Sequence, residues 1–232
     1  MLVLAIDTSA IASAALLKAH DEDGRAEVLE SFATTETNTH SEVLAPAIAG
    51  LLEQAGIDGR ELERIVVGVG PGPFTGLRVG IATARTLGFA WGVPVDGVMS
   101  LDAIAWDVLA DPAEAGAVGE GFSVAIDARR KELYWARYAG DGALLDGPHV
   151  GAPGDLPACR VYGAGTALYP EALAGAGATG VERFATRVPR AASLGAFALG
   201  CLAQGQELLP TTPLYLRESD AKVPAAMRKG TA

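Results

Sequence analysis

The chain is poor in basic residues, and this shortage excludes one class of function. Lysine and arginine together number 18 against 28 aspartates and glutamates, so the net charge is −10 at neutral pH. Because contact with a phosphate backbone requires a basic surface, this excess of acid argues against a dedicated nucleic-acid-binding protein. If RNA is involved, we expect a partner to hold it.

Cysteine and long apolar runs are also scarce. The two cysteines, Cys159 and Cys201, lie far apart and form no Cys-x-x-Cys pair, which disfavours a disulfide scaffold and suits a reducing cytosol. Residues 1–17 are apolar, but they lack a basic segment and contain Asp7, so they do not read as a signal peptide. No later run is long enough to span a membrane. We therefore expect a cytoplasmic protein with no membrane contact.

Glycine and proline, by contrast, alternate through residues 68–80, between an apolar run and a helix-like run. Such a junction can hold an anion on unpaired backbone N–H groups. The dinucleotide fingerprint fails, because its third glycine falls on Pro73 or Thr75, and the phosphate-loop pattern fails, because residues 65–92 contain no lysine. The prolines also remove backbone donors. We predict a rigid turn, with a residual anion-binding role left open.

The apolar pattern of the first half recurs in the second. Strands are predicted at 2–6, 12–19, 27–33, 65–69 and 93–98, and again at 122–126, 132–138, 143–150 and 160–162. Helices are predicted at 39–55, 75–91 and 101–110, the last with Ser100 as N-cap, and after Thr166 and Pro189. This repeat indicates a duplicated α/β fold. We expect an N-terminal domain over 1–112, a smaller C-terminal domain over 113–217 and a tail over 218–232.

Two of the predicted helices carry unusually little charge. Residues 43–52 have none, and between Gly76 and Trp91 the only charges are Arg78 and Arg85. A helix without a polar face is expected to be covered on more than one side. Small residues at every fourth position of the second helix, Gly76, Gly80, Ala84 and Gly88, would allow close packing. Whether they meet the chain's own sheet or a partner stays open.

Several motifs occur in the order found in the bacterial TsaB family, also called YeaZ. They are Ile6-Asp7-Thr8-Ser9, His40-Ser41-Glu42, Gly-Pro-Gly-Pro-Phe-Thr-Gly-Leu-Arg at 70–78, Asp-Ala-Arg-Arg at 127–130 and Pro-Leu-Tyr-Leu-Arg at 213–217. The chain resembles this family from its first residues to about Arg217. The resemblance implies a duplicated RNase H-like fold of the actin, sugar kinase and Hsp70 superfamily.

The resemblance also implies a function, that of a non-catalytic partner of TsaD. TsaD transfers threonylcarbamoyl to N6 of adenosine 37 in tRNAs that read codons starting with A. The implied partners are a TsaD-like subunit, a TsaE-like ATPase through the complex, a second copy when the chain is alone, and tRNA only indirectly. No cofactor is expected. The implied pairing surface lies on the helices at 39–55 and 75–91 and comprises Glu42, Leu44, Ala45, Ile48, Leu51, Leu52, Thr75, Leu77, Arg78, Ile81, Ala84, Arg85 and Gly88.

An enzymatic alternative stays open, an ATPase or small-molecule kinase of the same superfamily with nucleotide between the two domains. Its catalytic members hold phosphate and metal near the positions of Asp7 and Asp127. The remnant of such a site would comprise Asp7, Thr8, Ser9, Gly70, Gly72, Gly76 and Asp127. The second half, however, lacks an adenosine-binding Gly-Gly pair, and His40 is followed by Leu44 where catalytic relatives have a second histidine. We therefore predict no metal site.

Overall fold

The computed structural model describes residues 1–20, 26–35, 40–114, 116–119 and 121–217, apart from the side chains of residues 40 and 41. Its first sheet has the strand order β3-β2-β1-β4-β5. β1 pairs antiparallel with β2 and parallel with β4, so the sheet is mixed. The strands are β1 (Leu2–Asp7), β2 (Ser13–Ala19), β3 (Ala26–Ala33), β4 (Arg64–Gly68) and β5 (Val95–Val98).

The second sheet repeats this arrangement, with the order β10-β9-β6-β7-β8. Its central strand β6 pairs antiparallel with β7 and parallel with β9, as β1 does with β2 and β4. The duplication predicted from the sequence is thereby confirmed. The strands are β6 (Phe122–Asp127), β7 (Leu133–Tyr138), β8 (Leu144–Gly151), β9 (Arg160–Tyr162) and β10 (Thr179–Gly180).

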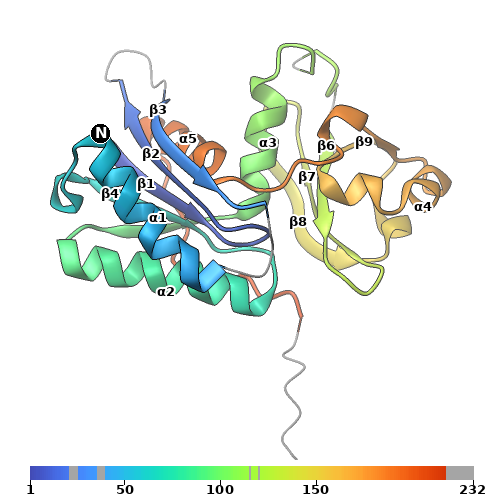
Figure 1. Cartoon of the computed structure of the whole chain (residues 1–232). Helices are drawn as coiled ribbons and strands as arrows, with labels where there is room; N and C mark the ends of the chain where they lie inside the picture. The colour runs from blue at the N-terminus through green and yellow to red at the C-terminus, as the bar shows by residue number, and fades with distance from the viewer. Residues whose placement is uncertain (21–25, 36–39, 115, 120, 218–232) are drawn as a thin grey trace, which may run out of the picture.

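Helices cover the first sheet on both faces (Figure 1). α1 (His40–Ala55) and α2 (Phe74–Trp91) pack on one face, and α5 (Ala191–Ala203) packs on the other. Successive side chains of a strand point to opposite faces, so Leu4 of β1 joins the core under α1 and α2 while Ala5 joins the core under α5. Both sides of β1 are therefore buried, which explains its unbroken apolar run.

α3 (Ser100–Ala110) joins the two sheets. Its residues Leu101, Ile104 and Val108 lie in the core of the second sheet, while Ala103 contributes to the core beneath α5. Figure 1 shows α3 between the two sheets. The described residues also form α4 (Pro170–Gly175) and short 3-10 turns at Gly59–Glu61, Pro153–Asp155, Ala164–Ala167 and Glu182–Phe184.

α5 lies away from the half of the sequence to which it belongs. It falls within 113–217, yet it packs on β1, β2, β3 and β4 of the first sheet. Gly195 makes this approach close, since a Cβ there would lie 2.5 Å from Leu17 and 2.9 Å from the Cβ of Ala5. The division of the chain at residue 112 stays a prediction, and α5 is an exception to it.

The segment after α5 returns along the first sheet. Leu209 exchanges two backbone hydrogen bonds with Gly97 of β5, and the Leu214 N–H donates to the Val69 carbonyl at 2.8 Å. We call residues 206–217 the strap. The predicted tail at 218–232 and the capping residue Thr39 lie outside the described residues. Within the described part of the chain, no helix is both long and apolar enough to cross a membrane.

Candidate functional site

The carboxyl group of Asp7, at the end of β1, is completely buried and hydrogen-bonded. Oδ1 accepts from the Ser9 N–H at 2.9 Å and from the Ser9 hydroxyl at 2.7 Å. Oδ2 accepts from the Ser100 hydroxyl at 2.7 Å, and the oxygen of Ser100 accepts the Gly70 N–H at 3.2 Å. Ser100 was predicted to cap α3, but Met99 is the N-cap and the Ser100 side chain bonds to Asp7 instead. The Ser100 hydroxyl thus bonds to a carboxylate 93 residues away and does not cap its own helix.

The glycine–proline turn is seated directly on this aspartate. A Cβ at Gly68 would lie 1.8 Å from Asp7 Oδ2, and a Cβ at Gly72 would lie 2.7 Å from the Ser9 carbonyl oxygen. Gly70 has φ 103°, a conformation that L side chains rarely adopt. Its N–H is bonded to Ser100 and is not available to an anion. These glycines are required by the close contact between the turn and β1, as expected of a rigid turn.

The small residues of α2 face the chain's own sheet. A Cβ at Gly80 would lie 2.3 Å from the Thr8 hydroxyl, which itself donates to the Gly76 carbonyl at 2.8 Å. At Gly88 a Cβ would lie 2.2 Å from Val95 of β5. The alternative left open by the sequence is therefore decided in favour of the intramolecular contact. These residues let α2 approach the ends of β1 and β5.

Asp127 occupies the position in β6 that Asp7 occupies in β1, but its surroundings differ. Its side chain is 29% exposed; Oδ1 accepts the Arg129 N–H at 2.7 Å, and Oδ2 lies 3.2 Å from Arg129 Nη1. Arg129, Arg130 and Lys131 all have left-handed φ angles, between 56° and 62°. The carboxylate therefore stabilises a tight β6–β7 hairpin, the role expected of a strand-end aspartate.

Most of the predicted pairing residues are inaccessible. Inside the monomer the structure buries Leu44, Ile48, Leu51, Leu52, Leu77, Ile81, Ala84 and Gly88. Glu42, Ala45, Thr75, Arg78 and Arg85 are exposed. The buried residues fill the space between the two helices and the sheet, so a partner cannot reach them in the folded chain. We therefore remove these buried residues from the predicted pairing surface.

The two arginines of α2 bind the strap. Arg78 Nε donates to the Tyr215 hydroxyl at 3.0 Å, and its guanidinium stacks 3.7 Å from the centre of the Phe74 ring. Arg85 donates to the hydroxyl and to the carbonyl of Thr211, both at 2.8 Å. The sequence offered only the seven-residue spacing of the arginines as a signal for this contact, and it did not identify the strap.

The sequence reasoning also missed the outer face of the two helices. Phe89 of α2 is 93% exposed, the largest exposed fraction among the large apolar side chains of the described chain. The helix pair also exposes small or apolar residues, namely Ala45, Pro46 and Ala49 on α1 and Ala82 and Ala90 on α2. Phe89 could have been found from its spacing, because it falls outside the buried stripe of α2.

A buried ion cluster fixes the connection between the sheets. Glu114 is 4% exposed and accepts from the Tyr162 hydroxyl at 2.5 Å, Arg160 Nη2 at 2.6 Å and Arg183 Nε at 3.0 Å. Burial raises the pKa of Glu114, but these hydrogen bonds and the two guanidinium charges outweigh it and hold the pKa below its usual value. Glu114, two residues after the predicted division at residue 112, is thereby tied to β9 of the second sheet. Within the described residues, no group of three His, Cys, Asp or Glu is placed to hold a metal ion.

The sequence is similar to several known proteins. The sequence profile of TsaD, described as tRNA N6-adenosine threonylcarbamoyltransferase, matches residues 27–156. An uncharacterised protein of Mycobacterium tuberculosis is 40% identical over 224 residues, which cover 95% of this chain and 93% of that protein. The Bacillus subtilis tRNA threonylcarbamoyladenosine biosynthesis protein TsaB is 32% identical over 147 residues, or 63% of this chain and 58% of that one.

The solved structures add the fold. YeaZ from Pseudomonas aeruginosa superposes with a TM-score of 0.71 and 28% identity, over 93% of this chain and 100% of that one. The fold is a duplicated RNase H-like fold, as the resemblance implied. Together with the buried aspartate and the glycine–proline turn, these likenesses place the chain: it belongs to the TsaD family and is a TsaB-like, or YeaZ-like, member of it.

Proposed function

We propose that this protein is a non-catalytic subunit of cytoplasmic tRNA threonylcarbamoyladenosine biosynthesis that acts by pairing with a TsaD-like catalytic subunit. The catalytic subunit would transfer threonylcarbamoyl to N6 of adenosine 37, and tRNA would contact this chain only indirectly. A TsaE-like ATPase would join through the complex. The names of the relatives support the pathway, and the proposal for pairing rests on the surface of α1 and α2.

The observation that carries the proposal is the exposure of Phe89. A phenylalanine that is 93% exposed gains about 1.5–3 kcal/mol when a partner covers it. Ala82, two helical turns before Phe89 on the same face of α2, is also exposed, and the ring can act as an anchor that inserts into a pocket of the partner. Aromatic side chains are enriched in protein–protein contacts.

The Asp7 cluster supports a non-catalytic role. A carboxylate that binds a metal–phosphate group through water must face an open site, whereas Asp7 is 0% exposed and bonded to Ser9 and Ser100. The alternative, a nucleotide-binding enzyme, predicts ATP binding that is lost in Asp7→Ala. Calorimetry with ATP and Mg²⁺ separates the two, and saturable submillimolar binding sensitive to that variant would favour the enzyme.

The pairing test is Phe89→Asp, measured by titration of the TsaD-like subunit from the same organism. Loss of about 2–3 kcal/mol corresponds to an affinity about 30- to 150-fold weaker. Leu145→Asp is the matched control, because Leu145 is 53% exposed on β8 of the second sheet. We expect that control to pair normally. Phe89→Asp with unchanged affinity and a normal unfolding temperature would contradict the proposal.

Charged substitutions within the buried stripe are unsuitable for this test. Ile48 is 2% exposed and Ala84 is 0% exposed, so a charge at either position would unfold the chain whether or not it pairs. Ala49→Glu, on the exposed side of α1, is the appropriate second variant. We also expect the isolated chain to form a homodimer through the same face, and light scattering should then show Phe89→Asp as a monomer.

A further inference from the structure

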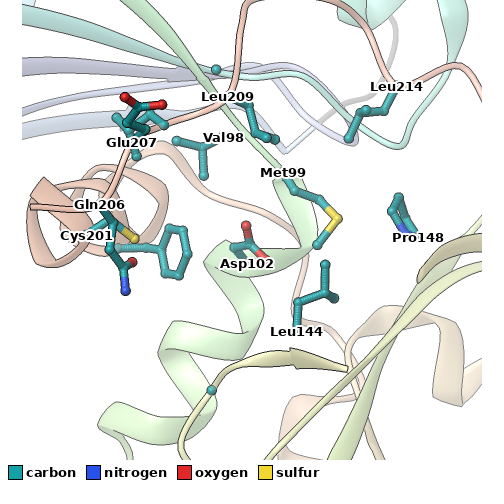
Figure 2. Close-up of a pocket in the computed structure, with 14 residues that line it drawn as sticks. Val98, Met99, Asp102, Leu144, Pro148, Cys201, Gln206, Glu207, Leu209 and Leu214 are labelled. Carbon is teal, nitrogen blue, oxygen red and sulfur yellow. The ribbon is translucent and has the colours of Figure 1, made fainter. Parts of the chain in front are cut away.

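A cavity of about 340 Å³ lies at the junction of α3, α5, β8 and the strap. Phe197 forms part of its apolar wall, together with Met99, Leu144 and Leu209 (Figure 2). A second cavity of about 470 Å³ shares Leu144 and Phe197 with it. These volumes fall in the range of small-molecule sites, about 300–1,000 Å³.

The polar lining of both cavities is acidic. Asp102 and Glu207 line the first and Asp141 lines the second, and among the described residues no lysine, arginine or histidine lines either one. Figure 2 shows the Asp102 carboxyl group at the centre of the first cavity. Its Oδ1 accepts the Tyr138 hydroxyl at 2.8 Å, which leaves Oδ2 for a ligand. Trp106, in the wall of the second cavity, adds an aromatic face suited to a cation.

We propose that this cavity binds a small organic cation, an amine carried on an apolar body, with the ammonium group on Asp102. The body would pack against Met99, Leu144 and Phe197. A neutral apolar ligand would offer nothing to Asp102 Oδ2, and an anion would meet like charge from Asp102 and Glu207. The site lies on the α5 side of the first sheet, opposite α1 and α2, and it does not rest on the proposed function.

The ionisation of Asp102 sets the pH dependence of this binding. Burial raises the pKa of Asp102 to about 7, against a smaller lowering by the Tyr138 hydrogen bond. Burial also raises the pKa values of two neighbouring groups, the Tyr138 phenol and the Cys201 thiol, so both stay neutral near pH 7. Glu207 is the other acidic group that lines the cavity. An amine prefers the ionised carboxylate, and its affinity should therefore increase between pH 6 and pH 8.

The test uses tryptamine as the probe on the full chain, with tryptophol as its neutral analogue. We expect saturable tryptamine binding at pH 8 that is about tenfold weaker at pH 6, because the protonated fraction of a group with a pKa near 7 changes about tenfold. Asp102→Asn, whose side-chain oxygen can still accept the Tyr138 hydroxyl, should weaken tryptamine at least tenfold. Asp146→Asn, at an exposed position on β8 outside both cavities, should not.

Cys201 gives a second, independent reading because its side chain lines the cavity. In a Cys159→Ser background it is the remaining thiol, and tryptamine should slow its alkylation in proportion to occupancy. Absence of saturable binding, equal binding by Asp102→Asn, or alkylation unaffected at saturating tryptamine would each overturn the proposal. Equal affinity for tryptophol would overturn the requirement for a cation.

Discussion

Replacing Ser100 with alanine should show whether the Asp7 cluster is structural. The substitution removes the hydroxyl that donates to Asp7 Oδ2 at 2.7 Å and accepts the Gly70 N–H at 3.2 Å. A hydrogen bond to a carboxylate contributes about 1.5–3 kcal/mol, and a stranded buried N–H costs about 1–3 kcal/mol. Since both effects act together, we expect the free energy of unfolding to fall by about 3–5 kcal/mol.

The surrounding packing prevents water from replacing the hydroxyl. Ser100 and Asp7 are both 0% exposed, and a Cβ at Gly68 would already lie within 2.8 Å of the Ser100 oxygen. No space therefore remains for an additional molecule without movement of the turn. The free energy of unfolding should therefore fall by nearly the full contribution of the lost hydrogen bonds.

Urea unfolding followed by circular dichroism measures the effect. Ser193→Ala is the matched control, because the Ser193 hydroxyl also donates to a carboxylate, Asp107 Oδ1 at 2.6 Å, in a partly exposed place. We expect the control to lose only about 1 kcal/mol. A Ser100→Ala variant within 1 kcal/mol of wild type would refute the structural role and reopen Asp7 as a ligand-binding group.

Three further predictions follow from the same contacts. Gly80→Ala should destabilise the fold by about 1–3 kcal/mol, because the added Cβ meets the buried Thr8 hydroxyl. Gly50→Ala on α1 should instead stabilise the fold by about 0.5–1 kcal/mol, because the atom nearest to its added Cβ is 3.9 Å away. Thermal unfolding of the two variants measures both effects. Glu114→Gln should cost about 3 kcal/mol, near the low end for a broken buried ion pair since its arginines are 40% and 42% exposed. The pKa of Glu114 is lowered in the fold, so wild type should lose this contribution as pH falls below the usual carboxyl range, and the variant should not. Asp102→Asn should gain stability over wild type as pH rises from about 4 to 7 in denaturant titrations, because a folded pKa of about 7 against 3.8 makes the ionised wild type less stable; equal pH profiles would contradict this.

The repeat of strands was predictable because strand patterns are local. The apolar runs of β1 and β6 each end at an aspartate, and both predictions agree with the structure to within a residue. The apolar helices were identified as well. Their orientation was not, because residues 43–52 of α1 carry no charge and α2 has only two arginines, which leaves little local signal for which side is inside.

The candidate site was predictable only in part for the same reason. Asp7, Thr8 and Gly76 were selected from the sequence, and the structure brings them together at the end of β1. Ser100 was assigned to a helix cap, since its bond to Asp7 joins residues far apart in the chain. Phe89 was passed over although its spacing sets it outside the stripe of small residues on α2.

The sequence by itself determined the duplicated α/β architecture, the position of the rigid turn and the family. Each of these depends on periodicity or on residue order, which can be read from the sequence directly. Only the tertiary structure decided that α5 covers the first sheet, that the arginines of α2 hold the strap, and that the small residues of α2 face inward. Those outcomes depend on contacts between distant segments, whose relative energies become defined only when the core is packed.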